Sequence, residues 1–63
     1  MNGKKLRDLR KNSGKTLREI SYASGVTQTQ IINIENGTTE NPKIDTLISL
    51  AKALDCDIKD FLD

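Results

Sequence analysis

The sequence predicts a single all-α domain, and three observations support that prediction. Its 63 residues are enough for one domain only. Apolar residues recur at helical spacing, whereas no segment alternates apolar and polar residues as a half-buried strand does. Capping and stop residues recur at short intervals and divide the chain into five short helices. We therefore expect one compact five-helix domain over residues 1–63, without strands.

The first two expected helices are separated by a glycine. Leu6 and Leu9 lie three residues apart in a segment that ends at Gly14, because glycine readily adopts the left-handed conformation that terminates a helix. Thr16 and Glu19 form the T-x-x-E pattern of a capping box, which predicts the start of a second helix. Ile20 and Ala23 form the apolar face of this helix, and Gly25 ends it.

The third and fourth helices are expected on either side of a polar loop. Thr27 is a suitable N-cap for the third helix, Ile31 and Ile34 lie on one side of it, and Asn36-Gly37 ends it. After the loop of residues 38–43, apolar residues follow helical spacing at Ile44, Leu47, Ile48, Ala51 and Leu54. A last short helix, capped by Asp57, would contribute the apolar residues Ile58, Phe61 and Leu62.

The composition excludes several classes of protein. A chain with one cysteine and no histidine cannot close an internal disulfide or build a common zinc site. No apolar run approaches the roughly 20 residues that span a bilayer, and the N-terminus lacks the apolar stretch of a signal peptide. We therefore expect a soluble cytoplasmic protein without a metal, a cofactor or a membrane partner.

No set of residues in the sequence is typical of catalysis. Gly14-Lys15-Thr16 resembles the end of a phosphate-binding loop, but Leu9 stands where that motif needs its first glycine, and no strand precedes it. No nucleophile lies beside a base, and a chain of this size has little room for a substrate cleft. We expect a protein that binds a partner and is not an enzyme.

Charge is distributed unevenly along the chain. Residues 1–18 carry seven cations and one acid, a net charge of +6, and the other 45 residues carry three cations and eight acids, a net charge of −5. Such asymmetry indicates either a polyanionic partner for the basic end or an ordinary solvated helix face. Charge alone does not decide between these two interpretations.

The spacing of the second and third helices is the most informative feature, because a short turn containing glycine sets two helices at a steep angle. In this region the sequence closely resembles the phage-repressor and Cro-like (XRE-type) helix-turn-helix family. The matching residues are Ile20, Gly25, Val26, Ile31, Ile34 and the ending Glu35-Asn36-Gly37, with Leu6, Leu9, Arg10, Pro42 and the segment LISLAKALD outside the motif. The resemblance implies a lambda-repressor-like DNA-binding domain of bacterial or phage origin, with the motif formed by helices 2 and 3.

The resemblance also implies a role for the amide and hydroxyl side chains of the third helix, at about residues 28–35. Gln28, Thr29 and Asn33 occupy base-reading positions, and the amides can pair with adenine in the major groove. Ile32 falls between the two faces, so it either meets a thymine methyl group or covers the rim of the core. Gln30 is expected to be solvated or near a phosphate.

Phosphate contacts are expected around this helix. The residues are Arg10, Thr16 at the start of the second helix, Asn36, Thr38, Thr39 and Lys43. Relatives pair an arginine of the first helix with the glutamate of Glu-Asn-Gly, which implies a structural ion pair between Arg10 and Glu35.

Five residues depart from the family pattern. Leu17 stands where relatives place a phosphate-binding glutamine, and Ser21 replaces a small alanine. Ser24 is expected to loosen the junction of the two helices, and Glu40 to weaken attraction to the DNA backbone. Cys56 is expected to fill an apolar place in the core.

These observations predict a sequence-specific regulator of transcription that binds double-stranded DNA, acting as a repressor. A single helix reads few base pairs, so a homodimer on a palindromic operator is expected. Ile58, Phe61 and Leu62 either form the dimer contact or pack within the monomer. The alternative function is a protein-interaction module on the same scaffold, and the chain is either complete or the N-terminal domain of a longer regulator.

Overall fold

Four α-helices and one short 3-10 helix follow one another along the chain in the computed structural model, which describes residues 2–39 and 41–62. The helices are α1 (Gly3–Ser13), α2 (Leu17–Ser24), α3 (Gln28–Glu35), α4 (Ile44–Ala53) and η1 (Ile58–Phe61). No strand occurs within those two described segments. The expectation of five α-helices is therefore wrong at the last element, where four residues capped by Asp57 form a single 3-10 turn.

Side chains at the helix starts satisfy backbone N–H groups that would otherwise lack partners. The hydroxyl of Thr16 accepts from the N–H of Glu19 at 3.1 Å, and the Glu19 carboxylate accepts from the N–H of Thr16 at 2.9 Å. This reciprocal pair confirms the predicted capping box. Asn2, which was not predicted as a cap, accepts from the N–H groups of Lys4 and Lys5 with its side chain and caps α1.

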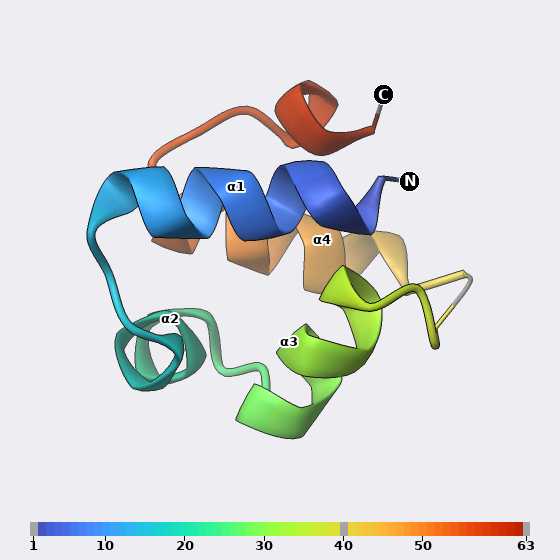
Figure 1. Ribbon diagram of the computed structural model, residues 1–63, viewed down its shortest axis with the longest axis horizontal. Coiled ribbons are helices and arrows are strands. Elements are labelled where there is room, and N and C mark those ends of the chain that lie inside the picture. The colour runs from blue at the N-terminus through green and yellow to red at the C-terminus, as the bar shows by residue number, and fades with distance from the viewer. Residues whose placement is uncertain (1, 40, 63) are drawn as a thin grey trace.

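The helices are arranged around one core, and the molecule extends over 23 × 21 × 19 Å along its principal axes. Figure 1 shows α1 running across the front, α4 behind it, α2 seen nearly end-on, and α3 rising steeply beside α2. α1 packs against α3 and η1, while α2 packs against α3 and α4. The longest helix, α1, has 11 residues, and none of the helices in the described segments is long and apolar enough to cross a bilayer.

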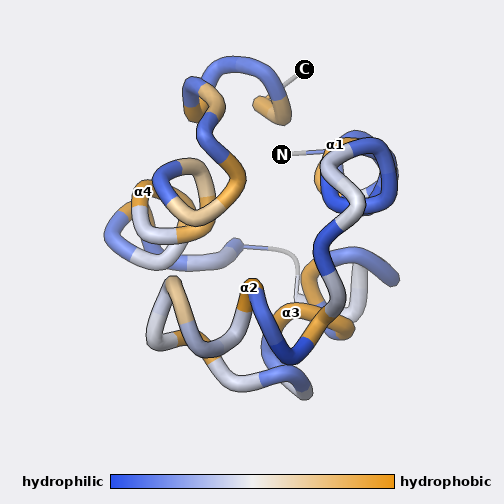
Figure 2. Tube along the Cα trace, turned by 90° about the vertical axis from the view of Figure 1, so that its left-hand side faces the viewer, coloured by the Kyte–Doolittle hydropathy of each residue, from blue (hydrophilic) through white to orange (hydrophobic). Residues whose placement is uncertain are grey.

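The core contains residues from every helix, although α1 is strongly hydrophilic and contributes little to it (Figure 2). The buried residues are Leu6, Ile20, Val26, Ile31, Ile34, Leu47, Leu50, Ala51, Ala53, Leu54 and Phe61. The predicted apolar face of α4 is partly wrong, because Ile44 is 58% exposed and Ile48 is also exposed, whereas Leu50 and Ala53 are buried. The predicted apolar position Ala23 on α2 is likewise exposed.

The C-terminal apolar residues were expected either to form a dimer contact or to pack within the monomer, and most of them pack within the monomer. Phe61 is fully buried, and Ile58 packs against the core at its edge. Only Leu62 is left substantially exposed. Phe61 is therefore excluded as a dimer contact and is not available to anchor another protein, because its side chain is fully buried in a turn that packs against α1 and α4.

Gly3 allows α1 to approach α3 closely. A β-carbon at this position would overlap the carbonyl oxygen of Ile34 and lie 2.7 Å from the carbonyl oxygen of Glu35. Both obstructing atoms belong to the backbone of α3, so they cannot rotate away as a side chain could. The absence of a side chain at Gly3 is therefore a packing requirement.

We expect Gly3→Ala to lower the free energy of unfolding by about 1–3 kcal/mol, because the added methyl group pushes α1 away from α3. Urea denaturation measures this loss, with Lys4→Ala as the control on the exposed side of the same helix. If Gly3→Ala were as stable as the control, α1 and α3 would not be in close contact, since alanine is otherwise the better helix former.

Candidate nucleic-acid interface

The turn between α2 and α3 has three residues and is held by local contacts. Gly25 adopts the left-handed conformation with φ of 75°, and its N–H donates to the carbonyl of Ser21. The hydroxyl of Ser24 accepts from the N–H of Val26 at 3.1 Å, and the Val26 side chain is buried. Ser24 was expected to loosen this junction, and the structure shows that its hydroxyl forms a hydrogen bond within the turn.

α3 begins with a second capping box, which the sequence analysis did not recognise. The hydroxyl of Thr27 accepts from the N–H of Gln30, and the Gln30 amide oxygen accepts from the N–H of Thr27, both at 3.1 Å. Thr27 is thus the predicted N-cap. Gln30 is exposed and its amide oxygen is engaged in the cap, so only its NH2 group could donate to a phosphate. The T-x-x-Q pattern could have revealed this, because glutamine replaces glutamate in capping boxes.

The two sides of α3 differ in exposure. Ile31 and Ile34 are buried in the core, which fixes the rotation of the helix about its own axis. Gln28 and Thr29 are exposed at the start of the helix, and Asn33 is half-buried one turn further along. Ile32 is 40% exposed, so it lies at the rim between core and solvent.

The expected pairing of Arg10 with Glu35 is present and joins α1 to the end of α3. The Nε of Arg10 donates to Oε2 of Glu35 at 2.8 Å, and its NH2 group donates to Oε1 at 3.1 Å. The side chains are only 15% and 5% exposed. The hydrogen bond that Arg10 donates to Glu35 raises the pKa of its guanidinium, although partial burial opposes this. This pairing uses two of the five N–H donors of the guanidinium, which leaves fewer donors for a phosphate.

The start of α2 is less suited to a phosphate than expected. The N–H of Thr16 donates to the Glu19 carboxylate, and this hydrogen bond lowers the pKa of that carboxyl group and keeps it charged near neutrality. A negative charge at a helix N-terminus satisfies the helix dipole and repels a second anion. Leu17 adds no polar group, because it packs against the core.

The segment after α3 brings several of the expected phosphate contacts near one another. Asn36 caps the C-terminal end of α3, and Asn36, Thr38, Thr39 and Lys43 are all exposed. Thr39 and Lys43 line one groove of about 370 Å³ beside the end of α3. Glu40, which was expected to weaken backbone attraction, lies outside the described residues.

Lys15 has a structural role that the sequence did not reveal. Its Nζ donates to the carbonyl oxygen of Ala53 at 2.9 Å and lies 3.7 Å from the carboxylate of Asp55. A lysine ammonium at the end of a helix satisfies a terminal carbonyl and complements the dipole. Lys15 thus connects the start of α2 to the end of α4, although 38 residues separate it from Ala53.

Cys56 lies where the sequence analysis expected it, packed against the core, although it is only partly buried. Desolvation raises the pKa of its thiol, and the carboxylates of Asp60, Asp57 and Asp55 raise it further. The thiol is therefore protonated at neutral pH and is a poor nucleophile.

Comparisons with known proteins agree on the class of this fold. A family model described as a helix-turn-helix domain matches residues 3–63. The crystal structure of the restriction-modification controller protein C.AhdI from Aeromonas hydrophila superimposes with a TM-score of 0.88 and 27% sequence identity, covering 95% of this chain and 89% of that one. The chain therefore shares the all-helical architecture of a helix-turn-helix controller protein.

A relative identified by sequence leads to the same class. Over 53 residues, 84% of this chain, the sequence is 43% identical to the HTH-type transcriptional regulator y4dL of Sinorhizobium fredii. The chain spans 26% of that regulator's length. The chain belongs to the XRE-type helix-turn-helix family.

Proposed function

We propose that this chain is a sequence-specific DNA-binding domain that regulates transcription as a repressor. In this proposal α2, the turn at Gly25 and α3 form the helix-turn-helix, and α3 enters the major groove. The observation that carries the proposal is the rigid presentation of Gln28 and Thr29, which are exposed at the start of a helix whose opposite side is buried. The similarity to an HTH-type transcriptional regulator and to a restriction-modification controller protein supports the same function.

The side chains on the exposed side of α3 have the chemistry needed to read base edges. The amides of Gln28 and Asn33 can each donate to and accept from adenine, and the hydroxyl of Thr29 can bond to several bases. Ile32 is exposed enough to contact a thymine methyl group. Capping by Thr27 and Gln30 keeps the first turn ordered, so these side chains are positioned before DNA binds.

Phosphates on either side of the groove would be held by the surroundings of α3. We assign the main contacts to Lys43, Asn36, Thr38 and Thr39, which are all exposed. Thr16 and Arg10 are weaker candidates, because Glu19 occupies the start of α2 and Glu35 engages the guanidinium. We propose a single binding domain that acts in the cytoplasm, without catalytic activity or a cofactor.

One recognition helix reads too few base pairs for useful specificity, so we propose that the protein binds a palindromic operator as a homodimer. The apolar side chains available for a dimer contact are Ile44, Ile48 and Leu62, which are exposed in the monomer. They replace Phe61 and Ile58 in the expected interface, since those two residues pack inside.

We expect Gln28→Ala to weaken binding to the operator by about 1–3 kcal/mol and to relax the base preference at one position. The reason is that an exposed amide that reads a base contributes to the specific complex but not to the fold. Titrations of labelled operator and random duplexes measure both affinities, with Asn12→Ala as the matched control, because Asn12 is an exposed amide near the end of α1. Equal losses on operator and random DNA would refute a base-reading role for Gln28.

A further inference from the structure

The exposed side of α2 carries an aromatic residue with no packing role. Tyr22 is 92% exposed, the highest value among the large hydrophobic residues that the structure describes as exposed. Arg18 lies four residues before it, which places both side chains on the same face of α2. They line a shared groove with Lys15, Glu19 and Ala23. Burial of Ile20 in the core requires this face to point to solvent.

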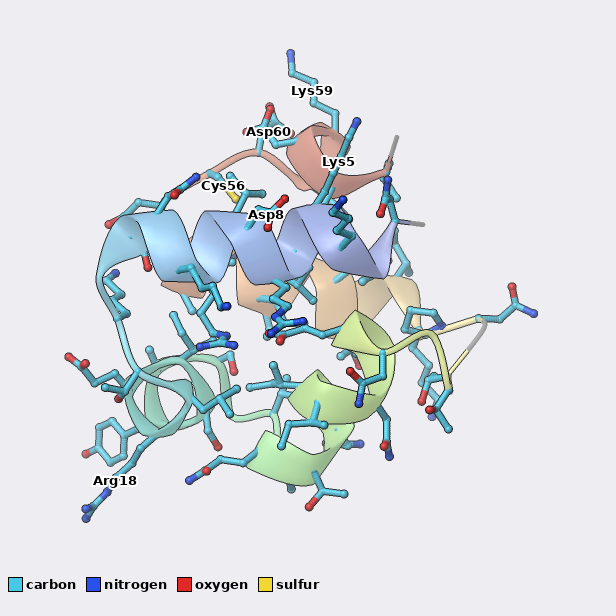
Figure 3. All side chains as sticks on the ribbon, viewed as in Figure 1. Lys5, Asp8, Arg18, Cys56, Lys59 and Asp60 are labelled. Carbon is cyan, nitrogen blue, oxygen red and sulfur yellow. The ribbon has the colours of Figure 1, made fainter. Side chains whose placement is uncertain are left out.

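The charged residues on this face of α2 differ in whether they form a hydrogen bond or an ion pair within the protein. Lys15 donates to Ala53, and Glu19 bonds to Thr16, so both are engaged at the ends of helices. Arg18 forms no hydrogen bond or ion pair with any residue in the described segments. Figure 3 shows its side chain extending away from the body of the molecule at the lower left. The start of α3, light green in Figure 1, lies at the bottom of the same view.

We propose that Arg18 and Tyr22 bind a backbone phosphate that flanks the groove occupied by α3. This inference rests on the proposed function, in which α2 crosses the DNA backbone while α3 lies in the groove. The guanidinium of Arg18 supplies a positive charge and several donors, and the phenol of Tyr22 supplies a further donor to the same anion. The Tyr22 ring, one turn away, offers a face on which the Arg18 side chain can stack.

The proposal gives α2 a contact that its N-terminus does not provide. Leu17 packs against the core and the Glu19 carboxylate occupies the first turn, so anion binding at the helix start is disfavoured. The Arg18 side chain extends away from the body of the molecule, so its guanidinium can meet an anion that does not approach the N–H groups at the start of α2 (Figure 3). The DNA backbone would then be contacted from α2 as well as from Lys43 and Thr39, which follow α3 in the chain.

The test compares Arg18→Gln with Lys59→Gln in titrations of operator and random duplexes at several salt concentrations. Both substitutions remove one exposed positive charge, but Lys59 lies at the top of the view in Figure 3, on the opposite side of the molecule from Arg18. We expect Arg18→Gln to lower affinity roughly tenfold on both DNAs and to reduce the salt slope by about 0.9. Lys59→Gln should leave the slope unchanged.

Tyr22→Phe removes the hydroxyl and keeps the ring, so the same titrations measure the contribution of the hydroxyl alone. We expect a uniform loss of about threefold with an unchanged salt slope, because a neutral donor releases no counterion. If Arg18→Gln and Lys59→Gln bind alike, the inference is overturned, and the face of α2 is left to a protein partner. If the unaltered protein binds no duplex at all, the proposed function itself fails. That result is distinct from equal binding by Arg18→Gln and Lys59→Gln, which would overturn only the role of Arg18.

Discussion

Replacing Arg10 with alanine is expected to lower the free energy of unfolding by about 3 kcal/mol, the lower end of what is lost when one partner of a buried ion pair is removed. Glu35 is only 5% exposed, so the substitution leaves a carboxylate with little water and without its two charged hydrogen bonds. The partial exposure of Arg10 is the reason for choosing the lower end. Urea denaturation followed by circular dichroism measures the loss.

The double substitution Arg10→Met with Glu35→Leu is the control for this prediction. Removing both charges eliminates the stranded carboxylate, so most of the lost stability should return. The comparison distinguishes a costly unpaired charge from a general need for bulk between α1 and α3. If Arg10→Ala were as stable as the unaltered protein, the carboxylate of Glu35 would be in contact with water in solution. The Arg10–Glu35 ion pair would then not be needed to hold α1 against the end of α3.

Phe61→Ala is expected to cost about 3–5 kcal/mol of stability, because it removes the largest fully buried side chain from a small core. A chain of this length is stable by only roughly 3–9 kcal/mol, so much of the protein should be unfolded. Thermal and urea denaturation measure this loss. Leu62→Ala is the matched control, since the neighbouring leucine is 37% exposed and should cost far less.

The concentration dependence of unfolding identifies the role of Phe61. If its ring packs within one monomer, the substitution lowers stability equally at all protein concentrations. If instead the ring formed a dimer interface, dilution would destabilise the unaltered protein, and Phe61→Ala would abolish that dependence. The second pattern would contradict the burial of Phe61 described above.

Local signals predicted the helix boundaries well. The capping box at Thr16 and Glu19 and the stop at Gly25 depend on residues within a few positions of each other, so the sequence contains all that is needed to recognise them. The buried pair Ile31 and Ile34 also follows from spacing within one helix. For this reason the exposed side of α3, and with it Gln28 and Thr29, could be located without coordinates.

Features that depend on contacts between distant segments could not be predicted. α4 is apolar over more than half of its circumference, so helical spacing allows either Ile44 or Leu50 to face inward, and packing against α2 and η1 decides. Contacts across 25 or more residues, such as that of Lys15 with Ala53, leave no periodic signal. The Arg10–Glu35 contact was expected only through a family resemblance.

The central claim is that α3 reads a DNA sequence, and a binding selection on randomised duplex DNA tests it most directly. The unaltered protein and Asn33→Ala are run in parallel at two salt concentrations. We expect a palindromic consensus that loses information at one position of each half-site in the Asn33→Ala selection. Absence of any enriched sequence, with only weak and salt-sensitive binding to all duplexes, would contradict the claim.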